Sequence, residues 1–80
     1  MSRESILEEV LLNLYSYLYI DDDGSLTENT KFRELEMDDE EIVDFVVDFE
    51  DTFECVLSRE AKDYQTVGCL VDAICDAINE

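Results

Sequence analysis

The chain has 80 residues, which limits it to one small domain, residues 1–80, whose core is too small to enclose a deep active site. Its 23 Asp and Glu against 5 Lys and Arg give a formal net charge of −18 at pH 7, which disfavours nucleic acids and anionic membranes as partners and favours basic proteins. Because 46% of the residues are hydrophobic, we expect a folded domain and not a disordered chain.

The start of the chain and its cysteines indicate a cytoplasmic protein without a metal or cofactor. The first ten residues, MSRESILEEV, mix acidic residues into the apolar pattern, which is not the pattern of a secretory signal. No segment approaches the roughly 20 apolar residues of a membrane span. Three cysteines without a C-x-x-C pair, in a chain without histidine, argue against a disulfide framework and against a zinc site.

The first predicted helix covers about residues 5–19. Its apolar residues recur on one helical stripe, formed by Leu7, Val10, Leu11, Leu14 and Leu18. The tyrosines in YSYLYI also alternate as in a strand, but the sequence offers no second strand to pair with them. Residues 21–31 contain Gly24 among charged and small polar residues and are predicted to form a loop.

The loop sequence YIDDDGSLTENT invites comparison with the calcium loop of an EF-hand. With Gly24 at the sixth position, Asp21 and Asp23 fall on ligand positions. Tyr19 and Thr30 then occupy the first and twelfth positions, where calcium ligands are required. We therefore expect a solvated loop without a specific calcium site.

The clearest helical pattern begins after Asp38. Its buried stripe is predicted to consist of Ile42, Phe45, Val46, Phe49 and Phe53. Acidic residues occupy the other side of this helix, and they are Asp39, Glu40, Glu41, Asp44, Asp48, Glu50, Asp51 and Glu54. Like charges four residues apart mildly destabilise a helix, so the pattern favours a partner-binding surface over a face that is only solvated.

Two further helices are predicted in the last third of the chain. Residues 58–64 are expected to form two helical turns with Ser58 as N-cap. Thr66 is expected to cap a last helix, whose stripe consists of Val67, Leu70, Val71, Ile74 and Ile78. Cys55, Cys69 and Cys75 flank the apolar stripes, and we expect them to pack in the core and not to act as reactive thiols.

In this order the elements resemble the acyl carrier protein family. The resemblance covers residues 6–78 and includes, in chain order, Thr27, the TKF of residues 30–32, Leu35, Asp38, IVDFVVDFEDTF, VLSREAKDY and TVGCLVDAI. It implies an all-α fold, an acyl-carrier-protein-like four-helix bundle with three major helices and one short helix.

The resemblance gives a specific meaning to the start of the second long helix. Acyl carrier proteins have Asp-Ser-Leu there, and the serine hydroxyl is the attachment point of 4'-phosphopantetheine. Asp38, Asp39 and Glu40 occupy these positions, and a carboxylate at Asp39 cannot act as the hydroxyl acceptor. In the family, basic patches of partner enzymes recognise this helix, so the resemblance implies partner-binding roles for Asp38, Asp39, Glu40, Glu41, Asp44, Asp48 and Asp51.

The sequence therefore favours a protein-binding module that docks its acidic second helix on a basic partner. One form of this function is an immunity or antitoxin protein that covers the active site of a basic toxin, and another is a regulatory subunit. The alternative is a divergent acyl carrier of lipid or polyketide synthesis, modified at another hydroxyl such as Ser25 or Ser58. An enzyme is disfavoured because the chain has no histidine and no nucleophile beside a base.

Overall fold

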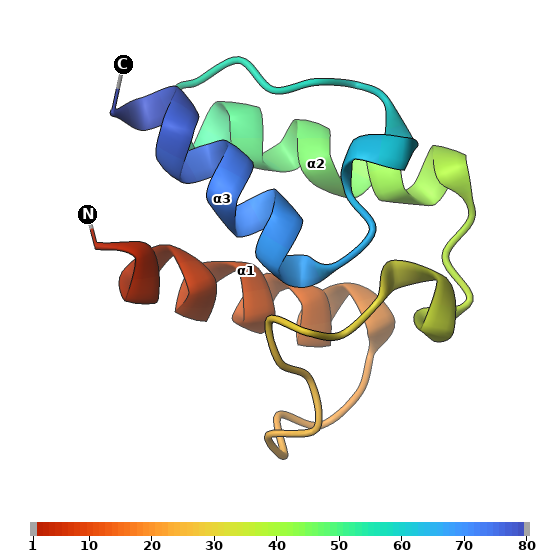
Figure 1. Cartoon of the computed structure of the whole chain (residues 1–80). Helices are drawn as coiled ribbons and strands as arrows, with labels where there is room; N and C mark the ends of the chain where they lie inside the picture. Colours follow the sequence, from red (N-terminus) through yellow and green to blue (C-terminus); the bar gives the residue numbers. More distant parts are fainter. Residues whose placement is uncertain (1, 80) are drawn as a thin grey trace.

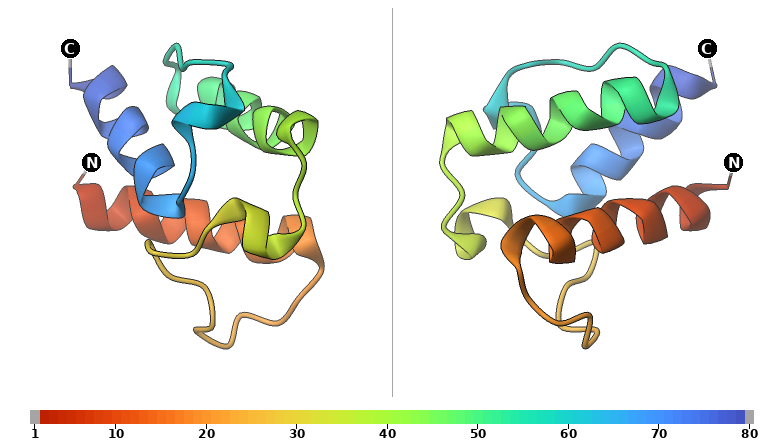
Figure 2. Two further views of the ribbon diagram at one scale, coloured as in Figure 1. Left: turned by 45° about the vertical axis from the view of Figure 1, so that its right-hand side comes forward. Right: turned by 180° about the vertical axis from the view of Figure 1, so that it is seen from behind.

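The computed structural model describes residues 2–79 and confirms the all-α class, with no named strand in that range. The elements follow one another as α1 (Arg3–Leu18), η1 (Phe32–Leu35), α2 (Asp39–Phe53), η2 (Ala61–Asp63) and α3 (Val67–Ile78), where η marks a 3-10 helix. In Figure 1, α3 crosses α1, and α2 lies behind α3. Both ends of the chain lie on one side of the molecule, while η1 and η2 lie together at the opposite end (Figures 1 and 2).

Each α-helix begins at a polar side chain that accepts a hydrogen bond from the first turn. Ser2 Oγ accepts from the backbone N–H of Ser5 at 3.2 Å, and Thr66 Oγ1 accepts from that of Cys69 at 3.2 Å. These bonds satisfy N–H groups that have no partner inside the helix. Because Ser2 and not a later residue is the cap, α1 begins two residues earlier than the apolar pattern predicted.

The core is formed by the facing apolar sides of the three α-helices. The stripes predicted for α2 and α3 are confirmed, apart from Phe53 and Ile78, which are only partly buried at the helix ends. The ring of Phe45 lies at the centre of an aromatic cluster, with ring centroids 5.0 Å from Phe49, 5.5 Å from Tyr17 and 6.1 Å from Phe32. Tilted and edge-on pairs of this kind stabilise a core beyond the area that they bury.

The stripe predicted for α1 is partly wrong. Leu7, Leu11 and Leu18 are only partly buried, whereas Ile6 and Tyr15 are buried together with the predicted Val10 and Leu14. The hydroxyl oxygen of Tyr15 accepts a 2.9 Å hydrogen bond from the backbone N–H of Leu26 in the following loop, and Leu26 is buried as well. The loop thus covers part of α1, a contact that the helical pattern does not contain.

The two-turn helix predicted for residues 58–64 is also wrong, because only the single 3-10 turn η2 forms there. Ser58 is not the N-cap of η2. Its hydroxyl donates to the carboxylate of Asp63 at 2.6 Å and accepts from the backbone N–H of Glu60 at 3.3 Å, which closes a turn instead. The structure also contains the unpredicted η1, which buries Phe32 and ends at Glu36 with a φ of 60°.

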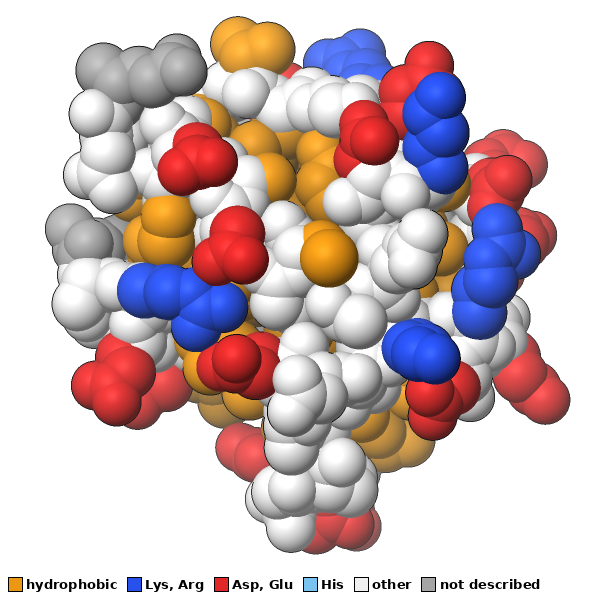
Figure 3. Space-filling model, in the orientation of Figure 1, with side chains coloured by type: hydrophobic (Ala, Val, Ile, Leu, Met, Phe, Trp, Pro, Cys, Tyr) orange, Lys and Arg blue, Asp and Glu red, His pale blue; other side chains and the backbone are white. Residues whose placement is uncertain are grey.

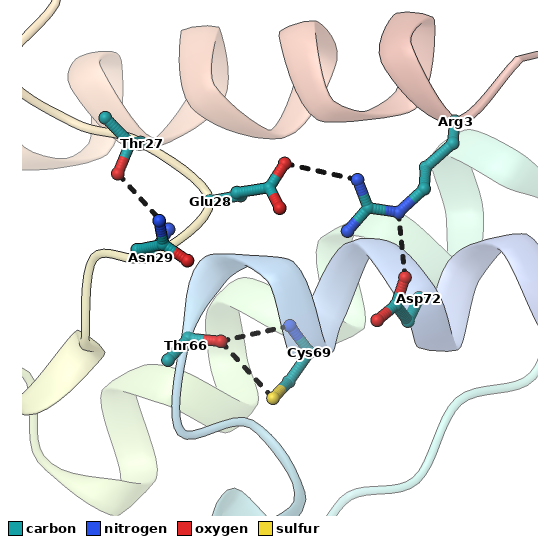
Figure 4. A network of polar contacts seen from close by, with 7 residues as sticks. All are labelled: Arg3, Thr27, Glu28, Asn29, Thr66, Cys69 and Asp72. Carbon is teal, nitrogen blue, oxygen red and sulfur yellow. Dashed lines mark hydrogen bonds and ion pairs between the residues drawn. The ribbon is translucent and has the colours of Figure 1, made fainter.

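The predicted loop, which follows α1, is confirmed up to the start of η1, and a polar network fastens it to α1 and α3. Arg3 Nη1 donates to Glu28 at 3.2 Å, and Arg3 Nε donates to Asp72 at 2.8 Å (Figure 4). The backbone N–H of Gly68 donates to the carbonyl oxygen of Glu28 at 2.7 Å. A Cβ atom at Gly68 would lie 3.1 Å from that oxygen, so a larger residue would push the loop and the helix apart by a few tenths of an ångström.

No helix in the described part of the chain is long and apolar enough to cross a membrane. Within residues 2–79, no group of three or more Cys, Asp or Glu side chains is arranged to hold a metal ion. In the loop, hydrogen bonds from Ser25 lower the pKa of Asp23. One of these is the bond from the Ser25 backbone N–H at 3.0 Å, so this carboxylate serves the local turn.

Candidate functional site

The acidic residues at the start of α2 divide into those that serve the helix and those that do not. Asp38 and Glu41 form a capping box, in which Asp38 Oδ1 accepts from the backbone N–H of Glu41 at 2.8 Å. The backbone N–H of Asp38 in turn donates to Glu41 Oε1 at 3.4 Å. Both carboxylates are therefore used by the helix terminus, which is a sufficient reason for their presence.

Asp39, the first residue of α2, is paired with a cation from η1. Nη2 of Arg33 donates to Asp39 Oδ1 at 2.7 Å, and both side chains are largely exposed. An exposed pair of this kind contributes little to folding stability. It does neutralise the charge at Asp39, so this residue contributes less to an attractive negative surface than the sequence alone implies.

Apart from Glu50, the remaining acids of α2 form an exposed line, which we call the acidic stripe: Glu40, Asp44, Asp48 and Asp51. Their spacings of four, four and three residues place them on one side of the helix, opposite the buried face. Among residues 2–79, no ion pair includes any member of the acidic stripe. The predicted partner-binding residues thus include a subset that forms no ion pair with the described residues, although Arg59 and Lys62 lie across a hollow from Glu40 and Asp44.

Glu50 was expected on the solvated side of α2, and this prediction is wrong. Its side chain is only 11% exposed, and Oε2 accepts from the backbone N–H of Leu57 at 3.2 Å. Oε1 accepts from Arg59 Nε at 3.2 Å. Glu50 therefore fastens the segment that connects α2 with η2.

The acidic stripe lies between two open hollows. The first has a volume of about 510 Å³ and separates the start of α2 from η2, with Arg59, Glu60, Ala61 and Lys62 on the far side. The second has a volume of about 240 Å³ and lies between α2 and α1, lined in part by Asn13, Tyr17 and Thr52. The stripe is therefore a ridge that a partner surface can approach from the front and along both flanks.

Tyr17 on α1 lies close enough to the acids of α2 to be affected by their charge. Partial burial raises the pKa of the Tyr17 hydroxyl, and the nearby carboxylates raise it further. The contributing carboxylates are Glu41, Asp44, Asp38 and Asp48, in decreasing order of effect. Asp44 and Asp48 of the acidic stripe and both members of the capping box therefore disfavour ionisation of this phenol.

The other candidate groups for covalent attachment lie away from the start of α2. Ser25 belongs to the exposed loop, and Ser58 is engaged in the turn before η2. Cys69 was expected to be buried but is exposed in the first turn of α3, where hydrogen bonding to Thr66 lowers its pKa. Cys55 is partly buried, and burial raises its pKa.

The described residues thus form a compact set of helices with an acidic ridge along α2. No family model, no curated protein and no solved structure matches the chain. The chemistry of the ridge is therefore the basis on which a function can be proposed.

Proposed function

We propose that this protein is an acyl-carrier-like helical domain without a prosthetic group, which binds a basic protein through the acidic stripe of α2. In this proposal η2 corresponds to the short third helix of the family's four-helix bundle. Support comes from the order of the elements and from Asp39, which offers no hydroxyl at the position of the family's modified serine. The observation that carries the proposal is the exposed line Glu40, Asp44, Asp48 and Asp51, which forms no ion pair with the described residues.

Folding alone does not account for the acidic stripe. Like charges at successive turns repel one another, and each such pair mildly destabilises the helix. Asp51 lies near the C-terminus of α2, where the helix dipole disfavours negative charge and no basic residue is present in the last turn. An arrangement that opposes the stability of the isolated helix is expected where a binding partner supplies the missing positive charge.

The expected partner is a protein with a basic groove or patch. A basic toxin such as a nuclease is one form, because an acidic ridge can occupy a groove that is shaped for phosphates, and the protein would then be an immunity or antitoxin protein. A basic subunit of an enzyme complex is the other form. In both, the negative field accelerates the encounter and makes it sensitive to salt.

The test compares the wild-type chain with the double variant Asp44→Asn, Asp48→Asn. Both proteins are immobilised and used to capture partners from cells that encode the chain, and the association rate of the purified partner is then measured against ionic strength. We expect a basic partner, with an association rate that falls steeply with salt and is lowered roughly tenfold in the double variant. Circular dichroism should show unchanged helix content.

The matched control is Asp22→Asn, Asp76→Asn. These residues are exposed, lie outside α2 and form no ion pair among residues 2–79, and the control changes the net charge by the same amount. Asp72 is unsuitable because it accepts a hydrogen bond from Arg3. Equal losses in both double variants would show that the partner senses total charge and would contradict docking on the acidic stripe.

A further inference from the structure

Basic residues are scarce in this chain, and most of them gather at one end of the molecule. Four of the five Lys and Arg residues lie in or beside η1 and η2, and they are Lys31, Arg33, Arg59 and Lys62. Figure 3 shows Lys and Arg side chains along the right-hand edge of the molecule, over η1 and η2. The positive charge is thus concentrated at this end of the molecule, where Asp and Glu side chains lie among the cations (Figure 3).

Three of these cations line one cavity. It has a volume of about 230 Å³, lies between η1, α2 and η2, and is lined by Lys31, Arg33, Ile42, Ala61, Lys62, Tyr64 and Gln65. No acidic side chain belongs to this lining, although the chain contains 23 Asp and Glu. The charged residues of the lining are therefore all cationic, although Asp39 lies beside Arg33 and Glu60 beside Lys62.

The cationic groups around the cavity retain capacity to bind an anion. Lys31 forms no ion pair within the described part of the chain, and Lys62 approaches Glu60 only to 3.9 Å. Arg33 uses Nη2 for Asp39, and its other N–H groups donate to no side chain among residues 2–79. A guanidinium and two ammonium groups are suited to carboxylate, phosphate or sulfate oxygens.

The other residues of the lining give the cavity a small apolar wall. Ala61 is partly buried, whereas Ile42 and Tyr64 are 1% exposed and offer a ligand only the edge of a side chain. The Tyr64 hydroxyl already donates to the carbonyl oxygen of Ser58, so the exposed edge of the ring offers mainly carbon atoms. Apolar surface beside a few polar groups is a feature of small-molecule sites.

We propose that this cavity binds a small organic anion, with its carboxylate, phosphate or sulfate group on Lys31, Arg33 and Lys62 and its short apolar body against Ala61 and the exposed edges of Ile42 and Tyr64. The site is independent of docking by the acidic stripe. It is connected to the start of α2 through Arg33, because a bound anion competes with Asp39 for the guanidinium. Removal of the Asp39 charge should therefore strengthen binding.

The first test is a titration of the ¹⁵N-labelled protein, followed by NMR, with phenyl phosphate, inorganic phosphate and phenol as separate probes. We expect phenyl phosphate to shift the amide signals of residues 31–33 and 61–65 and to bind at least roughly fivefold more tightly than either fragment, because it contacts both the cations and the apolar wall. Absence of shifts at these residues would overturn the proposal. Equal affinities for phenyl phosphate and inorganic phosphate would overturn the role of the apolar wall.

Matched single-charge variants form the second test. Lys62→Gln should weaken the binding of phenyl phosphate by roughly threefold or more, whereas Arg59→Gln, which lies outside the lining of this cavity, should change it little. Asp39→Asn should strengthen it, and Glu34→Gln, an exposed η1 residue that removes the same charge, should not do so to the same extent. Equal effects within either pair would show that only net charge matters and would overturn the assignment of the site.

Discussion

The guanidinium of Arg33 donates a 2.7 Å hydrogen bond to the carboxylate of Asp39, the first residue of α2. In the proposed acyl-carrier-like assignment, Asp39 would take the position of the family's modified serine. The position is thus held by a carboxylate that already has a cationic partner, and the partner comes from η1, an element that the sequence did not predict. Arg33 also lines the cationic cavity, and Asp39 directly precedes Glu40, the first residue of the acidic stripe. The pair therefore lies between the two proposed binding sites.

The first prediction is that the chain does not accept phosphopantetheine. Incubation with coenzyme A and a promiscuous phosphopantetheinyl transferase should leave the intact mass unchanged, because Asp39 provides no acceptor hydroxyl. The variant Asp39→Ser, Glu40→Leu restores the family's Asp-Ser-Leu and should gain one phosphopantetheine. Modification of the wild-type chain at Ser25 or Ser58 would instead support the divergent acyl carrier.

A second prediction concerns salt. Ion pairs among residues 2–79 engage only five carboxylates, those of Glu28, Asp39, Glu50, Glu60 and Asp72. The other acids repel one another, and salt screens this repulsion, since the Debye length shortens to about 10 Å at 0.1 M. The thermal midpoint should rise as sodium chloride is increased from low to moderate concentration, and millimolar magnesium should raise it further. A midpoint that falls over this range would show that attractive pairs dominate.

Glu50 and Asp51 are neighbours in sequence but should differ in their effect on stability. Glu50→Ala leaves the part-buried N–H of Leu57 without its acceptor and should lower the free energy of unfolding by about 1–3 kcal/mol. Asp51→Ala removes an exposed charge near the helix C-terminus and should be neutral or slightly stabilising. Urea denaturation of the two variants measures the difference. Similar values would contradict the structural role of Glu50.

Much of the fold could be predicted because its signals are local. The apolar stripes of α2 and α3 repeat at helical spacing, and the caps Asp38 and Thr66 directly precede them. The buried face of α1 was less predictable because Tyr15 contacts a loop residue eleven positions away. The length of the helix at η2 was overestimated because the hydroxyl of Ser58 suits both a helix cap and a turn.

The candidate site was predictable only in part, because some of its contacts join residues from different segments of the chain. Helical spacing alone gives the exposed positions of Asp44 and Asp48, and the structure agrees. The partners of Asp39 and Glu50 lie on η1 and on the segment after α2, so no pattern within α2 reveals them. The cationic cavity joins three separate segments of the chain and has no signature in any one of them.

The exposed position of Cys69 leads to a prediction about thiol reactivity. Hydrogen bonding to Thr66 lowers the pKa of Cys69, whereas burial raises that of Cys55, so Cys69 has the larger thiolate fraction at neutral pH. Brief treatment with iodoacetamide followed by peptide mapping should show Cys69 modified before Cys55 and Cys75. Thr66→Val should slow the reaction and Thr66→Ser should not, because serine retains the hydroxyl. Faster labelling of Cys55 would contradict the order of the two pKa shifts.

The final prediction concerns alkaline pH. Tyr64 is 1% exposed, and burial, followed by the charge of Asp63, raises the pKa of its hydroxyl above the ordinary value. In the unfolded chain this phenol ionises near pH 10, whereas in the folded chain it retains its proton to higher pH. The unfolded state therefore binds fewer protons above about pH 10, and the free energy of unfolding falls as pH rises from the unfolded pKa toward the folded one.

Tyr64→Phe separates this effect from the hydrogen bond that Tyr64 donates to the carbonyl oxygen of Ser58. At pH 7 the variant should be less stable by about 1 kcal/mol because the bond is lost. Above about pH 10 its stability should fall less steeply than that of the wild type, because the group that ionises on unfolding is absent. Tyr19→Phe is the control, since Tyr19 is 96% exposed and should leave both values unchanged. Equal alkaline slopes for wild type and Tyr64→Phe would assign the pH dependence to other groups, of which Tyr17 beside the acidic stripe is the first to examine, because its pKa is also raised.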